Sequence, residues 1–204
     1  GTASVSSIRM ALGLADFVVN ETGFAADLGA EKFFDIVMPA SGLRPDVAVI
    51  VASVRAVAAA GRDNLARHVE NMRHFGVPAV VGINQFPGDT DEEIASLRDY
   101  VERELGTSCA ISDVYGRGAE GGLELAEKVA ATAPANAVPL YDPELPLADK
   151  IRTVARRVYR AGEVVIETAA AKKLKLWQES GYGRLPVCIA KTQYSFSDNP
   201  KLAG

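Results

Sequence analysis

The chain has 204 residues, of which 48% are hydrophobic, and a formal net charge of -4 at pH 7. This length and composition are typical of a globular protein with one sizeable core, or one domain and an appendage. Charges of one sign form no block, which argues against a nucleic-acid partner, and no apolar stretch is long enough to span a membrane. Any anionic ligand must therefore be held by local cations or backbone amides.

Two cysteines, Cys109 and Cys188, lie far apart in the sequence, each in a short apolar run. Buried thiols in a reducing compartment are the favoured interpretation, and a disulfide or a metal pair is the alternative. The N-terminal residues show no signal-peptide pattern, so we expect a cytoplasmic protein. His68 and His74 share one predicted helix but are six residues apart, which turns them to different faces and argues against a two-histidine metal site.

Short apolar runs that alternate with helical patterns predict an α/β fold with a largely parallel sheet flanked by helices. The run 47–54 is rich in β-branched residues and apolar on both faces, which is typical of a central parallel strand. The predicted strands of this sheet are 17–19, 47–54, 79–84 and 109–115. The predicted helices that follow them are 30–36, 64–74, 91–105 and 123–131.

A Pro- and Ala-rich connection at 134–146 is predicted to be a linker. It would separate a core of residues 1–133 from a smaller C-terminal αβ element of residues 147–204. The predicted parts of this smaller element are the helices 147–159 and 168–180 and the strands 163–167 and 187–190.

Polar side chains follow the predicted strands, where ligands are met in open α/β sheets. Glu21 comes two residues after the end of the first run, and Asp27 lies six residues later. Nucleotide-hydrolysing folds use an acid after a strand to place a carboxylate near a magnesium-bound phosphate. The alternative is that both acids cap the next helix, and these residues alone favour that interpretation.

The second and third predicted strands end in Arg55 and in Asn84 with Phe86. Arg55 could meet a ligand oxygen, or it could be a solvated arginine at the start of a helix. Asn84 could read a purine edge, and the alternative is a turn with a helix N-cap at Asp89 or Thr90.

A polar cluster follows the last predicted strand. It places a cation, an amide, hydroxyls and a ring within six residues, which suits a flat anionic ligand that accepts and donates hydrogen bonds. Ser197, Asp198, Asn199 and Pro200 are also turn residues, so a strand that ends in a capped turn is the alternative. The residues of the cluster are Lys191, Gln193, Tyr194, Ser195 and Phe196.

Gly116, Gly118 and Gly121 form a Gly-x-Gly-x-x-Gly pattern between a predicted strand and a predicted helix. A dinucleotide site there is the weaker interpretation, because the preceding strand is short and polar and Glu120 would lie near the phosphates. The favoured interpretation is a glycine loop that leads into a helix.

Several of these stretches together resemble the formate–tetrahydrofolate ligase family. The run Leu-Pro-Val-Cys-Ile-Ala-Lys-Thr-Gln-Tyr-Ser-Phe-Ser-Asp at 185–198 is long, unbroken and mixed in chemistry, which makes the resemblance specific. Residues 21–36 and 83–90 are also similar to the family, as is Val-Ala-Ser-Val-Arg-Ala at 51–56. At that point the family signature continues with a lysine, a histidine and paired glycines, whereas this chain has Ala58, Ala60 and a single Gly61. The family also usually has a longer insert after this point, which this chain lacks.

The resemblance implies a P-loop-NTPase-like core and ATP-dependent joining of formate to tetrahydrofolate through formyl phosphate, giving 10-formyltetrahydrofolate. It implies ATP and Mg²⁺ as cofactors. It matches only the central portion of the family, without the P-loop segment, and the chain contains no Gly-Lys dipeptide. We therefore expect a partial or shortened ligase, with the P-loop supplied by a partner chain, or a homo-oligomer.

The resemblance also implies roles for the polar residues. Arg55 and Lys191 would be catalytic, Glu21 and Asp27 would lie near Mg²⁺ and phosphate, and Asn84 and Phe86 would lie near the nucleotide base. Gln193, Tyr194, Ser195 and Phe196 would form the folate and formyl site, with Phe196 stacking on the pterin ring. The alternatives are a non-catalytic folate- or nucleotide-binding module derived from the ligase, and a dinucleotide-binding protein that uses the three glycines.

Overall fold

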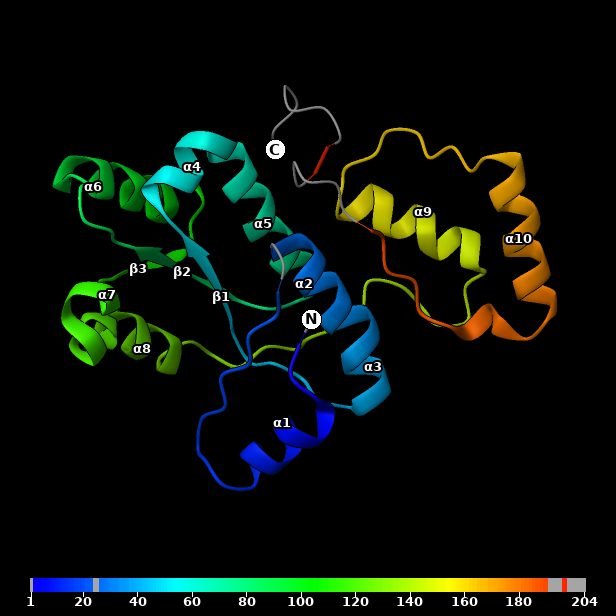
Figure 1. The fold of residues 1–204 in the computed structure, drawn as a ribbon, viewed down its shortest axis with the longest axis horizontal. Coiled ribbons are helices and arrows are strands. Elements are labelled where there is room, and N and C mark those ends of the chain that lie inside the picture. Colours follow the sequence, from blue (N-terminus) through cyan, green and yellow to red (C-terminus); the bar gives the residue numbers. More distant parts are fainter. Residues whose placement is uncertain (1, 24–25, 191–195, 198–204) are drawn as a thin grey trace. The chain divides into compact units, whose positions relative to one another are not determined.

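The computed structural model describes residues 2–23, 26–190 and 196–197. The chain divides into two compact units (Figure 1). Unit 1 comprises Gly1–Leu43 and Val138–Gln193, and unit 2 comprises Arg44–Ala137 and Tyr194–Gly204. The chain passes from unit 2 to unit 1 between Ala137 and Val138, inside the predicted 134–146 linker. The predicted division into 1–133 and 147–204 stays a prediction.

Unit 2 is an α/β unit built on a three-stranded parallel sheet, as the sequence predicts. Its strands are β1 (Ala48–Ala52), β2 (Ala79–Asn84) and β3 (Ser108–Ser112), in the order β1-β2-β3. Ala52 pairs with Ile83 and Asn84 pairs with Ser112, so the three strands end at the same edge of the sheet. β2 is the central strand and is buried over most of its length, as expected of a parallel strand covered on both faces.

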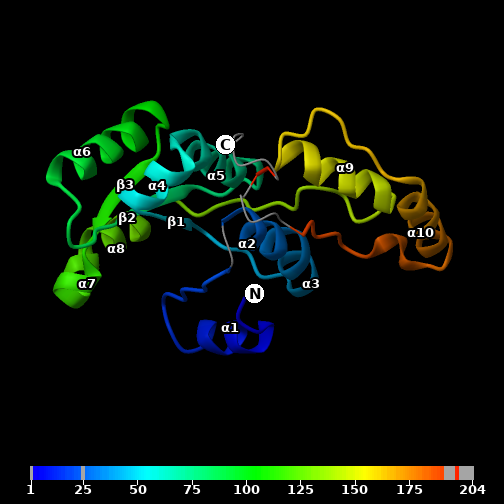
Figure 2. The same ribbon diagram turned by 45° about the horizontal axis from the view of Figure 1, so that its top comes forward.

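Helices cover both faces of this sheet. Figures 1 and 2 show α4, α5 and α6 on one side and α7 and α8 on the other. The bounds are α4 Val54–Ala60, α5 Arg62–His74, α6 Asp91–Asp99 with a π-helical continuation at Tyr100–Glu104, α7 Val114–Arg117, a 3₁₀ turn at Gly118–Gly122, and α8 Leu123–Ala130. The fully buried side chains of this unit include Phe75, Val77, Val80, Val81, Ile83 and Val101.

Unit 1 is helical in its described residues. One long helical segment consists of α2 (Ala26–Lys32), a π-helical turn (Phe33–Val37) and α3 (Met38–Ser41). It ends at Gly42, whose φ of 74° favours glycine. The other elements are α1 Val5–Leu12, α9 Leu147–Arg157, α10 Thr168–Glu179 and a 3₁₀ turn at Tyr182–Arg184. None of the helices in the described part of the chain is both long and apolar enough to cross a membrane.

Three predicted strands are wrong. Among the described residues, the runs 17–19, 163–167 and 187–190 belong to no sheet. Val19 is 95% exposed and Val165 is 75% exposed, so these short apolar runs are not part of a core. A run of three to five apolar residues has no intrinsic strand preference strong enough to act without a neighbouring strand. The predicted C-terminal αβ element therefore contains helices and extended chain but no strand among its described residues.

Two other boundaries also differ from the prediction. The strand predicted at 47–54 ends at Ala52, because Ser53 caps α4 by accepting a hydrogen bond from the backbone N–H of Ala56 (3.2 Å). The strand predicted at 109–115 ends at Ser112, because Asp113 caps α7 through the N–H of Gly116 (3.1 Å). Local capping therefore sets both strand ends.

Candidate functional site

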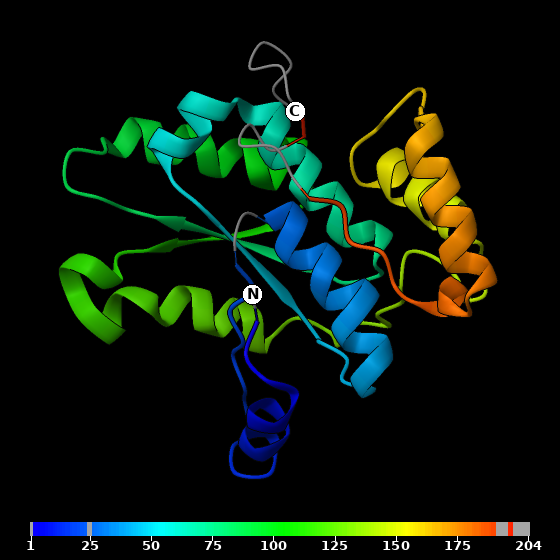
Figure 3. The same cartoon turned by 45° about the vertical axis from the view of Figure 1, so that its right-hand side comes forward.

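The carboxyl edge of the sheet in unit 2 gathers some of the predicted site residues. The strand register places the start of the β1–α4 connection beside the end of β2, and Asn84 beside Ser112. Figure 3 shows the three strands with helices above and below them. In open α/β sheets this edge is where ligands bind, particularly where loops diverge to opposite faces. Asn84 is the last residue of β2, Phe86 lies in the loop that follows it, and Arg55 lies at the start of α4, so all three are near this edge.

Arg55 is the second residue of α4, directly after the Ser53 cap. Its side chain is exposed, and within the described residues its guanidinium makes no hydrogen bond or ion pair. Toward the described residues, this cation is therefore available for a ligand oxygen. The geometry is compatible with either of the two interpretations that the sequence leaves open, a ligand contact or a solvated arginine.

The loop after β2 is held in one conformation by its own hydrogen bonds. The backbone N–H of Phe86 donates to Asp89 Oδ2 (2.9 Å), and the N–H of Asp89 donates to the Phe86 carbonyl (3.0 Å). Thr90 then caps α6 in a capping box with Glu93, so the turn and N-cap that the sequence offers as the alternative interpretation of this loop are present. The turn uses Asp89 and the cap uses Thr90 and Glu93, and Phe86 is left 41% exposed. Asn84 and Phe86 therefore remain available for a planar ligand.

Only part of the predicted folate segment lies within the described residues. Lys191, Gln193, Tyr194 and Ser195 lie outside them. Phe196 is described, and its ring centroid lies 4.7 Å from that of His68 on α5, at an interplanar angle of 44°. The Phe196 ring therefore contacts a ring of unit 2 itself, and its stacking on a pterin ring stays a prediction.

The glycine loop 116–121 is explained by packing within unit 2. A Cβ atom at Gly121 would lie 2.1 Å from the Asp113 carbonyl oxygen, and the Asp113 N–H donates to the Gly121 carbonyl (3.0 Å). Gly118 has a φ of 60°, which favours glycine. These contacts account for the glycines without a bound dinucleotide.

Replacing Gly121 by alanine should lower the free energy of unfolding by about 1–3 kcal/mol, because its methyl group would force two backbone segments apart. Gly162→Ala is the matched control, since a Cβ there would meet open space, and it should change stability by less than about 0.5 kcal/mol. Urea unfolding of both variants measures the difference. Equal effects would contradict this account of the loop.

In unit 1 the structure places Glu21 and Asp27 in different environments. Glu21 is exposed, whereas Asp27 is only 1% exposed. Because it has no side chain, Gly29 lets α2 approach the stretch that contains Glu21. A Cβ atom at Gly29 would lie only 2.9 Å from Thr22 Oγ1 and 3.0 Å from the Thr22 carbonyl oxygen. No group of three histidine, cysteine, aspartate or glutamate side chains arranged to hold a metal ion is present in the described part of the chain.

A row of buried acids on α2 and the π-helical turn was not predicted from the sequence. Asp27, Glu31 and Asp35 are spaced four residues apart along α2 and the π-helical turn, and all three are buried. Burial raises the pKa of Glu31 to about 7 and the pKa of Asp35 to about 7. The four-residue spacing was visible in the sequence, since it puts the acids on one helical face.

Two of these buried carboxylates, Glu31 and Asp35, accept hydrogen bonds from other parts of unit 1. The Ile189 N–H donates to Glu31 Oε1 (2.6 Å), and the Tyr159 hydroxyl donates to Glu31 Oε2 (3.1 Å). The Leu140 N–H donates to Asp35 Oδ1 (2.7 Å). The buried acids thus accept hydrogen bonds from chain segments far away in the sequence.

Two further side chains hold the same C-terminal stretch, residues 183–189, which we call the clamped segment. Lys150 Nζ donates to the carbonyls of Gly183 (2.7 Å) and Leu185 (3.1 Å). The Tyr141 hydroxyl donates to the Val187 carbonyl (2.9 Å) and accepts from the Val187 N–H (2.8 Å). Side chains thus take the place of a neighbouring strand here, which is why residues 187–190 are not part of a sheet.

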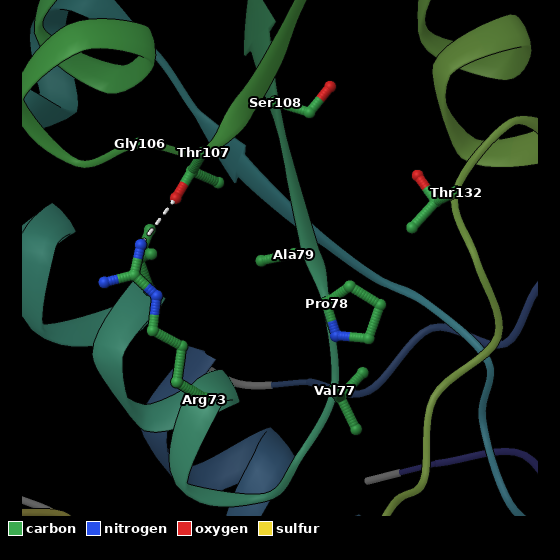
Figure 4. Close-up of a pocket in the computed structure, with 9 residues that line it drawn as sticks. Arg73, Val77, Pro78, Ala79, Gly106, Thr107, Ser108 and Thr132 are labelled. Carbon is green, nitrogen blue, oxygen red and sulfur yellow. Dashed lines mark hydrogen bonds between the residues drawn. The ribbon is translucent and has the colours of Figure 1, made fainter.

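A cavity of about 280 Å³ lies elsewhere in unit 2, at the amino ends of β2 and β3 (Figure 4). Its lining consists of Val69, Arg73, Val77, Pro78, Ala79, Gly106, Thr107, Ser108 and Thr132. The Arg73 guanidinium donates to Thr107 Oγ1 (3.2 Å) and to the Leu105 carbonyl. The one cation of the lining therefore already holds the protein's own oxygens, and none of the predicted site residues lines this cavity.

Known proteins are similar to this chain over its whole length, including residues 185–198, on which the family resemblance chiefly rests. A family model described as formate–tetrahydrofolate ligase matches residues 1–204. This chain belongs to the formate–tetrahydrofolate ligase family. Proteins with that name from Rhizobium etli, Sphingobium sp. and Allorhizobium ampelinum are 49%, 46% and 51% identical to it. Each match covers 100% of this chain and 40% of the relative.

The chain thus spans about 40% of the length of the curated formate–tetrahydrofolate ligases that it matches. Those matches extend over 225 residues, whereas the chain has 204. The ligases therefore have residues in this region for which the chain has no counterpart. Such a shortfall is expected after Gly61, where the family has a longer insert.

Proposed function

We propose that this chain takes part in the ATP-dependent ligation of formate to tetrahydrofolate, which gives 10-formyltetrahydrofolate in one-carbon metabolism. The observation that carries the proposal is the family match over the whole chain, with about half of the residues identical to named ligases. The accessible Arg55, Asn84 and Phe86 at one edge of a parallel sheet support it, because that edge suits a nucleotide.

In the proposed reaction, ATP phosphorylates formate, and the tetrahydrofolate amine then attacks the carbon of formyl phosphate, with phosphate leaving. Negative charge develops on phosphoryl oxygens in the first step, and cations stabilise it. We assign Arg55 and Lys191 to this role. Asn84 and Phe86 would contact the nucleotide base, and Gln193, Tyr194, Ser195 and Phe196 would contact folate and the formyl group.

A Mg²⁺ ion bound with ATP is held largely by phosphate oxygens and water, with one or two protein carboxylates. Of the two acids proposed for this neighbourhood, the exposed Glu21 fits that requirement. Asp27 does not fit it in this conformation, because its side chain is buried in the row of acids. We therefore propose Glu21 as the protein group nearest the ion and derive no step that depends on Asp27.

The phosphate cradle of the reaction is not evident in this sequence, which has no Gly-Lys dipeptide. We propose that another segment or chain supplies it, within a homo-oligomer or a complex with a partner chain.

Both cysteines are free, Cys109 buried and Cys188 half-buried, which agrees with a reducing compartment such as the cytoplasm.

The nucleotide part of the proposal can be tested with Phe86→Ala. Loss of a stacking ring should weaken MgATP binding about tenfold, the effect typical of removing an aromatic contact to a base. Phe17→Ala is the matched control, since Phe17 is 71% exposed in unit 1 and has no proposed role. Isothermal titration of the two variants and the parent chain measures the affinities. Equal affinities for all three would refute the role of Phe86.

A non-catalytic folate- or nucleotide-binding module is the second candidate function. Ala58 and Ala60, which stand where the family signature has a lysine and a histidine, favour it, as does the missing Gly-Lys dipeptide. Formate-dependent release of ADP distinguishes the two functions. The module would bind ligands without releasing ADP, even when a chain that carries the P-loop is added, whereas a ligase part would then show turnover.

A further inference from the structure

We propose that Asp89 is a positioning residue, which fixes the backbone of Phe86 in a tight turn and so presents the phenyl ring to a nucleotide base. The turn, residues 86–89, lies in the connection between β2 and α6 (Figure 1). That the ring meets a base rests on the function proposed above. The hold of Asp89 on Phe86 rests on described contacts of unit 2 alone.

The sequence from Phe86 to Asp89 fits one kind of turn. Pro87 occupies the second position, where its fixed φ is favourable, and Gly88 occupies the third with a φ of 100°. Proline followed by a glycine of positive φ is the signature of a type II turn. The N–H of Asp89 closes the turn by donating to the Phe86 carbonyl (3.0 Å). The local sequence therefore specifies the turn, and Asp89 is its last residue.

The side chain of Asp89 also bonds the first residue of the turn. Its Oδ2 accepts from the Phe86 N–H (2.9 Å), so both backbone polar groups of Phe86 are bonded to Asp89. A phenylalanine side chain has only two rotatable bonds and prefers staggered rotamers, so a fixed backbone leaves the ring few positions. Asp89 therefore restricts the ring without covering it.

The turn is anchored to unit 2 on both sides. Before it, the Gln85 N–H donates to the carbonyl of Ser112, the last residue of β3 (3.0 Å). After it, Thr90 Oγ1 accepts from the Glu93 N–H (3.2 Å), and Glu93 Oε2 accepts from the Thr90 N–H (2.9 Å). The turn thus joins the sheet to α6 by bonded residues at each end, which sets where Phe86 lies at the carboxyl edge.

The charge of Asp89 argues against a direct contact with the phosphates of a nucleotide. A carboxylate repels an anionic ligand, and Asp89 is half-buried with one oxygen on a backbone N–H. Aspartate side chains commonly bond backbone groups within turns, so this bond accounts for the residue type. We therefore expect Asp89 to act on the nucleotide through Phe86.

Asp89→Ala should weaken MgATP binding about fivefold, because the ring would then occupy its binding position for only part of the time. Asp89→Asn keeps an oxygen for the Phe86 N–H and should bind nearly as tightly as the parent chain. Asp91→Ala is the control for charge, since Asp91 is exposed and its side chain makes no hydrogen bond or ion pair within the described residues. Isothermal titration measures the four affinities.

A double-mutant cycle separates positioning from other structural effects. In a chain that already carries Phe86→Ala, Asp89→Ala should cause less than about a twofold further loss of MgATP affinity, since no ring is left to position. A fivefold loss in both backgrounds would show that Asp89 acts independently of the ring, and would overturn the proposal. An equal loss in Asp89→Asn or in Asp91→Ala would also overturn it.

A tryptophan reporter shows the hold on the side chain without any ligand. Trp177 is the only tryptophan of the chain, so in the double variant Phe86→Trp, Trp177→Phe the indole at position 86 emits alone. Its fluorescence anisotropy should decay with the tumbling of the chain. Adding Asp89→Ala should introduce a faster, nanosecond decay that Asp89→Asn does not introduce. The same decay in all three chains would show that Asp89 does not hold the ring.

The two readouts distinguish failure of this inference from failure of the proposed function. If the parent chain binds no MgATP, the nucleotide role of Phe86 fails and the positioning role fails with it, whereas the anisotropy still decides whether Asp89 fixes the side chain. If the parent chain binds MgATP and Asp89→Ala binds it as tightly, the proposed function stands and the positioning role is refuted.

Discussion

Phe75→Ala should lower the free energy of unfolding of unit 2 by about 3–5 kcal/mol, the range for truncating a buried phenylalanine. Phe75 is 0% exposed at the end of α5, and its backbone N–H still donates to the carbonyls of Asn71 and Met72. The connection 75–78 leads directly from α5 into the central strand β2. Truncation would therefore leave a cavity where α5 packs near the start of that strand.

The measurement is the protection of Cys109 from alkylation at increasing urea, because Cys109 lies buried in β3 of the same unit. Phe17→Ala is the control, since its exposed ring in unit 1 should contribute less than about 0.5 kcal/mol. A loss of less than about 1 kcal/mol for Phe75→Ala would show that Phe75 is not part of the core of unit 2.

Raising the pH from about 5 to about 8 should destabilise unit 1 by on the order of 5 kcal/mol through Glu31 and Asp35 together. Burial raises the pKa of Glu31 from 4.5 to about 7 and that of Asp35 from 3.8 to about 7. Below the unfolded values both states are protonated, and the stabilisation is fully present. Above them the unfolded chain loses its protons first, so stability falls as the pH rises through the folded values.

Trp177, the only tryptophan, lies on α10 in unit 1, so its fluorescence during urea unfolding reports on this unit. The double variant Glu31→Gln, Asp35→Asn is the control, and its stability should be nearly independent of pH over the same range. Stability that rises from about pH 5 to about pH 8 in the parent chain would contradict the raised pKa values of the two acids.

The parallel sheet of unit 2 could be predicted from the sequence because its signal is local. Residues 47–54 and 79–84 are apolar on both faces, and that pattern arises in a strand covered by helices on both sides. The carboxyl edge with Asn84 and Phe86 followed from the same pattern, because parallel strands end at one edge. The capping residues Ser53 and Asp113, not the apolar pattern, set where the strands end.

The clamped segment could not be predicted in the same way. Residues 187–190 have the composition of a strand, but their hydrogen-bond partners are side chains at Tyr141 and Glu31, 46 and 158 residues away in sequence. No local pattern encodes such contacts. The four-residue spacing of Asp27, Glu31 and Asp35 showed that the acids share a helical face, but not that the face is buried. Lys191, Gln193, Tyr194 and Ser195 stay predictions, since they lie outside the described residues.

The central claim is that this member of the formate–tetrahydrofolate ligase family keeps a ligand-binding function within its 204 residues. Isothermal titration of the chain with tetrahydrofolate, and separately with MgATP, tests it most directly. We predict saturable binding of tetrahydrofolate that Phe196→Ala weakens about tenfold and the exposed-ring control Phe17→Ala leaves unchanged. Absence of binding to both ligands would contradict the proposed function.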